Sequence, residues 1–177
     1  MDAVVCVSLD HGVEYMSDNR IMSGAVIEED VLISGGAFIG HNTVVRQGTC
    51  IYNAVVIGHN CTIEPCVTIG ERTRIQANVY ITKNTYIEDD VFIGPCVCTA
   101  NDWDILSHGR GEADLVGPTI MRGARIGAQA LLMPGVTIGE NAMVGAGSVV
   151  AEDVEAGTIV HGRKAEVTGR VKREHWL

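Results

Sequence analysis

Two histidines, His41 and His59, lie 18 residues apart, and each follows an Ile-Gly pair. Imidazole serves in proteins as a general base or as a metal ligand. A catalytic zinc centre needs three protein ligands and one open position, and this pair supplies at most two of them. We therefore expect His59 to cap a turn or to contact a substrate, and we expect no metal site.

A further histidine, His108, lies in the polar segment WDILSHGRGEADLVG, residues 103–117. It is the imidazole placed to act as a base if that segment folds over a site. Trp103, at the start of the segment, offers a stacking surface for a base or a sugar. A loop that walls a site shared with a neighbouring subunit is one interpretation, and an idle surface loop is the other.

The C-terminal segment is basic, although the chain as a whole carries a net charge of −9. Residues 160–177 hold five basic and two acidic side chains. A local excess of positive charge in an acidic protein attracts a polyanionic ligand. We expect Arg163, Lys164 and Arg170 to contact phosphates, with Arg122 and Arg125 behind them; an ordinary solvated tail is the alternative.

The elements that must position these side chains follow a period of six residues. From Ile21 to Ile93 every sixth residue is Ile or Val, and an aliphatic pattern resumes from Ile120 to Val150. Such a period fits neither an α-helix nor an alternating hairpin sheet. It fits a short strand and a turn in each unit, with three units closing a coil and equivalent positions of successive coils stacked.

The repeat therefore predicts an all-β parallel β-helix of about six coils, in a single domain spanning residues 1–177. Residues 1–18 fit the pattern poorly and are expected to form an irregular first coil or a cap. Segment 103–117 interrupts the pattern and is expected to loop out. Glycines of the Ile-Gly pairs, such as Gly40 and Gly127, are expected to permit a positive φ or a close approach between coils.

Composition excludes several classes of partner. The net charge of −9 argues against non-specific binding to nucleic acid or to anionic membranes. No stretch approaches the roughly 20 apolar residues of a membrane span, and the start MDAVVCVSLD lacks the basic residues of a secretory signal. The six cysteines form no CxxC and are interpreted as reduced, buried small hydrophobes. We expect a cytoplasmic protein.

Units such as VVIGHN, VTIGER and VTIGEN resemble the hexapeptide-repeat signature of the left-handed β-helix acyltransferases, from about residue 19 to residue 170. The run IQANVYITKNTYIEDDVFIGPCVCTAND is most similar to the nucleotide-linked amino-sugar N-acetyltransferases of that family. The resemblance implies a left-handed coil and a homotrimer with active sites between subunits. It also implies acetyl-CoA as co-substrate, no metal cofactor, and direct attack of a sugar amine on the thioester.

The resemblance also implies catalytic residues. Asn78, Glu88 and Asn101 match the family's polar cluster, and Glu88 is the one that can accept a full proton. A sugar amine is less basic than a lysine, so a polar residue that orients it could suffice. The alternatives are structural, because asparagines recur every 18 residues up to Asn78 and suit turns, and Glu88–Asp90 could be a solvated corner.

The remaining expectations concern the two ligands. The pairs Gly127-Ala128 and Gly145-Ala146 leave a corner without bulky side chains, where the pantetheine arm of CoA lies in the family that the chain resembles. The residues expected to contact the sugar substrate are His59, Asp102 and Trp103.

Two departures from the family keep other functions open. Thr99–Asp102 reads TAND, whereas relatives that acetylate hydroxyls have a TAGH-like loop with a histidine base. The run His161–Ala165 lacks the usual proline before its alanine. The alternatives are transfer to a hydroxyl or another amine with His108 as base, and a non-catalytic scaffold. A third is a zinc-dependent protein like the γ-class carbonic anhydrases, although the HxxxxH pair of that class is absent here.

Overall fold

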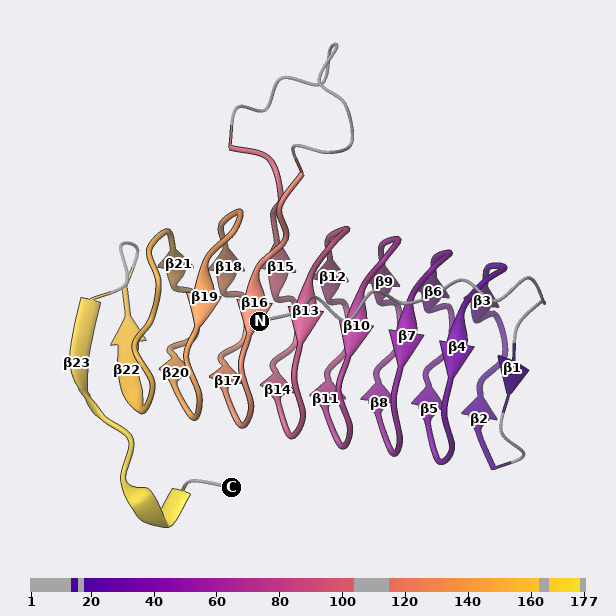
Figure 1. Ribbon diagram of the computed structural model, residues 1–177, viewed down its shortest axis with the longest axis horizontal. Helices are drawn as coiled ribbons and strands as arrows, with labels where there is room; N and C mark the ends of the chain where they lie inside the picture. Colours follow the sequence, from indigo (N-terminus) through magenta and orange to yellow (C-terminus); the bar gives the residue numbers. More distant parts are fainter. Residues whose placement is uncertain (1–13, 16–17, 104–114, 163–165, 176–177) are drawn as a thin grey trace.

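The computed structural model describes residues 14–15, 18–103, 115–162 and 166–175. In this part of the chain each six-residue unit forms a two-residue strand followed by a turn (Figure 1). Successive strands fall on three flat sheets, which we call A, B and C, so three units complete one turn of a prism. In Figure 1 the coil advances from right to left and descends at the front, so it winds left-handed. The predicted left-handed parallel β-helix is confirmed.

Each sheet collects every third strand. Sheet A contains β1 (Glu14–Tyr15), β4 (Leu32–Ile33), β7 (Cys50–Ile51), β10 (Thr68–Ile69), β13 (Tyr86–Ile87), β16 (Thr119–Ile120) and β19 (Thr137–Ile138). Sheet B contains β2 (Arg20–Ile21), β5 (Phe38–Ile39), β8 (Val56–Ile57), β11 (Arg74–Ile75), β14 (Phe92–Ile93), β17 (Arg125–Ile126), β20 (Met143–Val144), β22 (Thr158–His161) and β23 (Glu166–Arg170). Sheet C contains β3 (Val26–Ile27), β6 (Val44–Val45), β9 (Thr62–Ile63), β12 (Tyr80–Ile81), β15 (Cys98–Thr99), β18 (Leu131–Leu132) and β21 (Val149–Val150).

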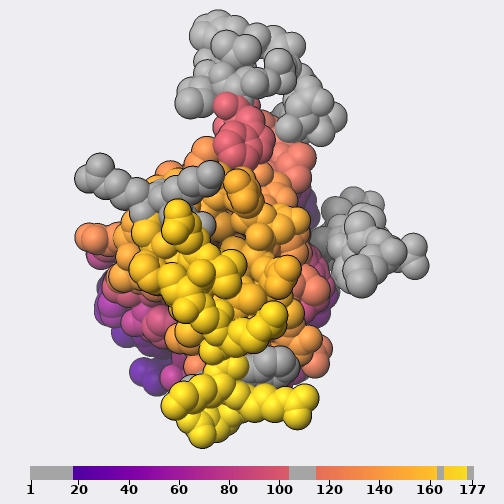
Figure 2. Space-filling model, turned by 90° about the vertical axis from the view of Figure 1, so that its left-hand side faces the viewer, coloured from indigo at the N-terminus to yellow at the C-terminus, as the bar shows by residue number. Residues whose placement is uncertain are grey.

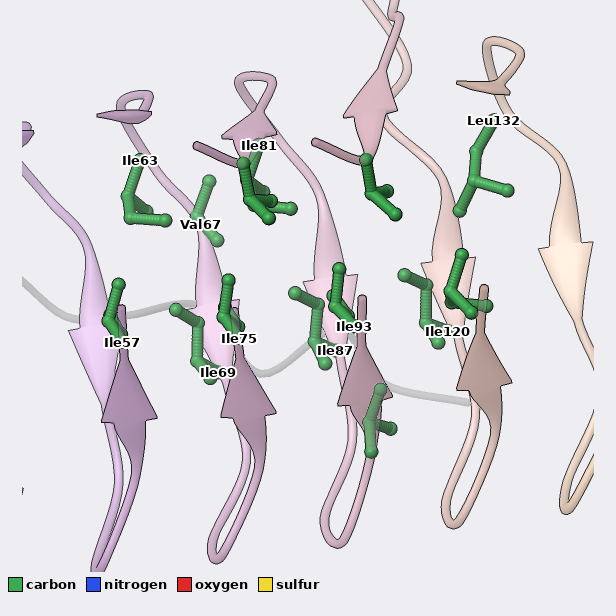
Figure 3. Close-up of a cluster of buried hydrophobic side chains, with 14 of the residues drawn as sticks. Ile57, Ile63, Val67, Ile69, Ile75, Ile81, Ile87, Ile93, Ile120 and Leu132 are labelled. Atoms are coloured by element: carbon green, nitrogen blue, oxygen red, sulfur yellow. The ribbon is translucent and has the colours of Figure 1, made fainter. Parts of the chain in front are cut away.

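The second residue of almost every two-residue strand points into the prism. Ile57, Ile75 and Ile93 are direct partners in sheet B, and the equivalent side chains of sheets A and C lie beside them in repeating layers (Figure 3). All three are fully buried. Burial of one such side chain contributes about 1.5–3 kcal/mol, so the repeat itself supplies a continuous core without large aromatic residues.

From Val31 onward the first position of each unit is also buried, which the repeat alone did not predict. It holds small residues, such as Val55, Cys61 and Thr43, each at most 1% exposed. The hydroxyl of Thr43 donates to the Gly58 carbonyl at 2.7 Å and accepts from the Cys61 amide at 3.1 Å. Threonine at this position therefore satisfies its own polar group within the backbone.

The glycines of the Ile-Gly pairs serve close packing and not a positive φ. A Cβ on Gly58 would lie 2.6 Å from the carbonyl carbon of Gln76 in the next coil. The positive φ values fall two residues later, at the sixth position of each unit, as at Asn60 (φ 55°). Of the two reasons expected for these glycines, only the close approach applies.

The structure has about seven coils, more than the six that the repeat predicted, because the counted pattern did not include the parallel strands β1, β15 and β22. β1 pairs with β4 before the first recognised unit. Unit 97–102 was passed over because its inward residue is Thr99 and not an aliphatic one. The register continues across segment 103–117, since Tyr86 pairs with Thr119 and Ile87 with Ile120. The chain leaves after β15 and rejoins before β16, as predicted (Figure 1).

A short hairpin covers the C-terminal end of the prism. β22 continues sheet B in parallel, and β23 turns back antiparallel to it. The 3-10 helix η2 (Arg173–His175) follows, and these C-terminal residues spread over the end that faces the viewer in Figure 2. In the described part of the chain, no helix is long and apolar enough to cross a membrane.

The cysteines correct one expectation. Cys61 is a buried free thiol, as predicted, and burial raises its pKa. Cys66, Cys96 and Cys98 are free but exposed, because two of them occupy turn positions and the third points outward from sheet C. Cys50 is disulfide-bonded, so the prediction of reduced, buried cysteines holds only in part. Cys6 lies outside the described residues.

Candidate functional site

The turns form three long edges of the prism, and each edge carries a different group of polar residues. The AB corner lies between a strand of sheet A and the following strand of sheet B. The BC corner lies between sheets B and C, and the CA corner between sheets C and A, in the same way. The AB corner includes residues 88–90, which follow β13. The BC corner includes residues 76–78, after β11, and the CA corner includes residues 100–102, after β15.

A pocket of about 300 Å³ lies on the sheet A side of the AB corner, with Glu88 in its wall. Its floor is open because the column that holds Tyr52 and Glu88 has a glycine, Gly70, between them. A Cβ on Gly70 would lie 2.4 Å from the carbonyl carbon of Glu88. Tyr86 also lines the pocket. The stacking that requires glycine therefore also creates a hollow beside the candidate proton acceptor.

Glu88 is held in place by the first coil after segment 103–117. Its Oε2 accepts a hydrogen bond from the Arg122 amide at 2.8 Å. Burial raises the pKa of the Tyr86 phenol, and the nearby Glu88 carboxylate raises it further. Tyr86 is therefore a neutral hydrogen-bonding group at neutral pH.

Acidic side chains dominate this pocket. Glu71 and Asp89 line it together with Glu88, and Arg122 is the cation of the lining, 3.6 Å from Asp89. Arg72, beside the pocket, pairs with Glu71. Hydrogen bonds from Asn53 and Arg72 lower the pKa of the Glu71 carboxyl. The lining thus holds more carboxylates than guanidinium groups, which favours a cationic ligand such as an ammonium group.

The crest of the AB corner is an ion-pair ladder next to this pocket. Arg72 donates through Nε to Asp90 Oδ1 at 2.6 Å and through Nη2 to Asp90 Oδ2 at 2.8 Å. Its Nη1 also donates to Glu71 Oε2 at 2.8 Å. The Arg72 hydrogen bonds lower the pKa of Asp90, and the Asp90 partner raises the pKa of Arg72. The pair joins two successive coils and leaves both groups charged.

The BC corner carries His59 and Asn78, which the sequence analysis assigned to the site. His59 Nδ1 accepts a hydrogen bond from the His41 amide at 2.9 Å, and the two rings stack with centroids 5.2 Å apart. Asn78 is exposed and has φ 59°. Both residues thus have the turn-supporting roles that were the structural alternatives, and their outer edges remain exposed to a ligand.

Farther along the BC corner, side chains become small. Ala128 and Ala146 occupy the position that His41 and His59 hold in earlier coils. A Cβ on Gly127 would lie 2.5 Å from the Ala146 amide nitrogen, so coil stacking alone requires that glycine. Ala146 is exposed, and the result is a low, uncluttered edge along which an extended ligand could lie.

The CA corner carries Asn101, Asp102 and Trp103 at the root of the excursion. Asn101 Nδ2 donates to the Lys83 carbonyl at 3.4 Å, and the Asn101 carbonyl accepts from the Val116 amide at 3.0 Å. The Trp103 indole donates to the Pro134 carbonyl at 3.0 Å while the residue remains 54% exposed. These bonds fix the departure of the segment and leave an aromatic surface outside.

One chain does not bring the predicted catalytic residues together. Asn78, Glu88 and Asn101 lie on the BC, AB and CA corners respectively. Of the predicted ligand contacts, Gly127, Ala128, Gly145 and Ala146 share the BC corner with His59 and Asn78. Arg170 is exposed in β23. Predicted residues His108, Arg163 and Lys164 lie outside the described residues.

Sequence reasoning missed the residues that shape the Glu88 pocket, namely Tyr52, Gly70 and Tyr86. The missing signal was available in the 18-residue spacing, because Tyr52, Gly70 and Glu88 form one column of the repeat. Arg122 lines the same pocket, although the sequence analysis placed it behind the phosphate contacts of the tail. Among the residues that the structure describes, no group of three or more His, Cys, Asp or Glu side chains could hold a metal ion.

Comparison with known proteins agrees with the architecture. No curated protein sequence matches the chain. A hexapeptide-repeat-containing acetyltransferase of Vibrio cholerae O1 biovar eltor, solved with acetyl coenzyme A, is similar with 29% identity and TM-score 0.52, over 66% of this chain and 70% of that one. A hexapeptide transferase family protein of Anaplasma phagocytophilum has the same fold, with 23% identity and TM-score 0.55, over 93% and 86% of the two chains.

A third similar structure is a mutant of AntD, an N-acyltransferase of Bacillus cereus, in complex with dTDP and coenzyme A. It has 19% identity and TM-score 0.55, over 89% of this chain and 84% of that one. The family model described as bacterial transferase hexapeptide (six repeats) matches residues 66–101 and 117–152. These two runs include every lining residue of the Glu88 pocket except Tyr52, together with the low edge at Gly127-Ala128 and Gly145-Ala146. The chain is therefore a hexapeptide-repeat protein that carries the repeats of the bacterial hexapeptide transferases.

Proposed function

We propose that the chain is an acetyl-CoA-dependent N-acetyltransferase that acts on a nucleotide-linked amino sugar. The observation that carries the proposal is the acidic pocket over Gly70, in which Glu88 is fixed by the Arg122 amide at 2.8 Å. The similar Vibrio cholerae acetyltransferase with acetyl coenzyme A supports the acyl donor. The resemblance of residues 75–102 to the amino-sugar enzymes supports the acceptor.

In this account the Glu88 pocket receives the amino sugar. Glu71, Glu88 and Asp89 attract its ammonium form, and the rings of Tyr52 and Tyr86 offer apolar surface to the sugar. The ammonium first loses one proton to solvent, and the neutral amine attacks the thioester carbonyl, so that a C–N bond forms and the C–S bond breaks. Glu88 accepts the second proton, which the attacking nitrogen sheds, and passes it to the leaving CoA thiolate.

Acetyl-CoA is assigned to the BC corner, along Gly127-Ala128 and Gly145-Ala146. The low profile of this edge and the backbone groups of its turns suit an extended pantetheine arm. Because the Glu88 pocket lies on the AB corner, the two ligands meet only if a second copy places its BC corner beside it. A homotrimer gives three such sites, and we propose this assembly, in the cytoplasm, for the working enzyme.

The proposal is tested by acetyl transfer in solution. Purified protein is incubated with acetyl-CoA and a panel of nucleotide-linked amino sugars that differ in the position of the amine. Products are identified by mass spectrometry, because the exposed cysteines Cys66, Cys96 and Cys98 would react with thiol reagents. We expect one or more members to be acetylated, and the matching nucleotide sugars with a hydroxyl in place of the amine to remain unchanged. Acetyl-CoA left unconsumed across the panel would refute the proposal.

A further inference from the structure

A second pocket lies on the other side of the AB corner, over sheet B. It has a volume of about 470 Å³, and Arg72, Arg74, Asp90, Phe92 and Arg125 line most of it. The acidic Glu88 pocket and this one share the crest of the corner, because Glu71 and Asp89 line the first and their chain neighbours Arg72 and Asp90 line the second. We call it the basic pocket.

Sheet register sets the centre of the basic pocket. Arg74 of β11 pairs with Phe92 of β14, and Phe92 pairs with Arg125 of β17. Neighbouring strands are about 4.8 Å apart, and the paired residues all point outward from the same face. A half-exposed phenyl ring, 39% exposed, is therefore flanked on both sides by guanidinium groups.

The lining of the basic pocket holds three arginines and one aspartate. Both carboxylate oxygens of Asp90 accept hydrogen bonds from Arg72, at 2.6 and 2.8 Å. Arg72 therefore compensates Asp90 in part, because it also donates to Glu71 at 2.8 Å, and Arg74 and Arg125 add two further guanidinium groups to the lining. In a chain of net charge −9, three arginines against one aspartate on one sheet face are suited to an anionic ligand.

A second arginine–phenylalanine pair in sheet B differs from the Arg74–Phe92 pair in one respect. Arg20 and Phe38 form the same cross-strand pair in sheet B, three coils before Arg74 and Phe92. There the guanidinium carbon of Arg20 lies over the Phe38 ring, 5.6 Å from its centroid. Phe92 has no cation of the described residues over it in this way, so its face can accept another planar group.

We propose that the basic pocket binds the nucleoside diphosphate of the acceptor, with the phosphates on Arg74 and Arg125 and the base on Phe92. Guanidinium groups pair with phosphate oxygens through two parallel hydrogen bonds, and aromatic rings stack on any base. The inference rests on the proposed function, because the sugar amine must then reach Glu88 across the Arg72–Asp90 crest. The two adjoining pockets, one acidic and one basic, match the two ends of a nucleotide-linked amino sugar.

The test is calorimetric titration of UDP, dTDP, GDP and ADP, each alone, into the wild-type protein and the double variant Arg74→Ala/Arg125→Ala. Loss of two charge-assisted contacts is expected to weaken binding of the preferred diphosphate by at least about tenfold. Phe92→Leu is expected to weaken it severalfold while inorganic pyrophosphate binding stays the same. Arg20→Ala and Phe38→Leu, the equivalent pair three coils away, are the matched controls and should bind as the wild type does.

A parallel titration with CoA separates the possible phosphate sources. Unchanged CoA affinity in the double variant supports the assignment to the acceptor, whereas a loss confined to CoA would overturn it. Absence of diphosphate binding in the wild type, or equal binding in the double variant, would also overturn it. Acetylation of an amino sugar in that case would leave the proposed function standing. Conversely, if diphosphate binding depends on the two arginines but no acetyl transfer occurs, the proposed function is refuted and the assignment of the basic pocket to a nucleoside diphosphate stands.

Discussion

The carboxylate of Glu88 accepts a hydrogen bond from the backbone amide of Arg122, 34 residues later in the chain, at 2.8 Å. The two residues are adjacent because segment 103–117 leaves and rejoins the prism without disturbing the stacking of β13 on β16. One carboxylate oxygen is thereby fixed to the main chain. The other has no hydrogen-bond partner among the described residues, and in the proposed mechanism it receives the amine proton.

Replacement Glu88→Gln keeps the shape of the side chain and removes its ability to accept a proton. We expect kcat to fall by about 10²- to 10⁴-fold, the usual contribution of a general base. KM for the amino sugar should change little, since the pocket keeps its walls. Steady-state kinetics on the identified substrate provides the measurement. Glu140→Gln, an exposed substitution on the same corner, is the control, and equal losses in both variants would contradict a special role for Glu88.

Ala146→Trp places a large ring on the low edge assigned to acetyl-CoA. Ala146 is exposed and has no positive φ, so we expect the fold to tolerate the change. Affinity for CoA in calorimetric titration should drop by at least about tenfold, which corresponds to about 1.4 kcal/mol. Ser23→Trp, at the equivalent turn position near the other end of the BC corner, should leave CoA binding unchanged. Retained affinity in Ala146→Trp would place CoA elsewhere.

The repeat made most of the fold predictable, and Glu88 shows where prediction stopped. One aliphatic residue in six was enough to infer the coil, because stacked Ile and Val side chains form most of the core. Because three units make one coil, the place of a unit in the repeat also gives the corner on which its polar residues lie. The pocket beside Glu88 required more, since it depends on the missing side chain of Gly70 and on the position of Tyr86 in the neighbouring strand.

Thr99 shows a second limit of pattern reading. Its hydroxyl accepts the Thr82 amide at 2.7 Å, where the equivalent amides of neighbouring coils, such as that of Glu64, donate to a main-chain carbonyl. A polar residue thus occupies an inward position because its hydroxyl accepts a hydrogen bond from a main-chain amide. It does so in the coil from which segment 103–117 departs. A search for aliphatic residues cannot detect this role.

Thr99→Val should therefore destabilise the protein, although valine is more apolar and nearly the same size. The buried Thr82 amide would lose its acceptor, at a cost of about 1–3 kcal/mol. Thr99→Ser keeps the hydroxyl and should retain the hydrogen bond, with only the smaller loss from one methyl group. Chemical denaturation of both variants and the wild type gives the comparison. A valine variant as stable as the wild type would show that the hydrogen bond has no net value.

The Arg72–Asp90 pair predicts a definite dependence on pH. Because Arg72 lowers the pKa of Asp90, the pair contributes stability above the ordinary aspartate pKa, about pH 4, and loses it as the pH falls through the lower folded-state value. A carboxyl titration by NMR should show the Asp90 midpoint below its ordinary value. In Arg72→Ala the midpoint should rise toward that value. An unchanged midpoint would mean that the pair does not persist in solution.

Use of acetyl-CoA by this hexapeptide-repeat chain is tested by calorimetric titration of the purified protein with CoA and acetyl-CoA. We expect micromolar binding of both, with about one site per chain, and weaker binding in Ala146→Trp. If neither ligand binds at millimolar concentration, the chain is not an acetyl-CoA-dependent enzyme, whatever its fold, and a non-catalytic role for the β-helix is favoured.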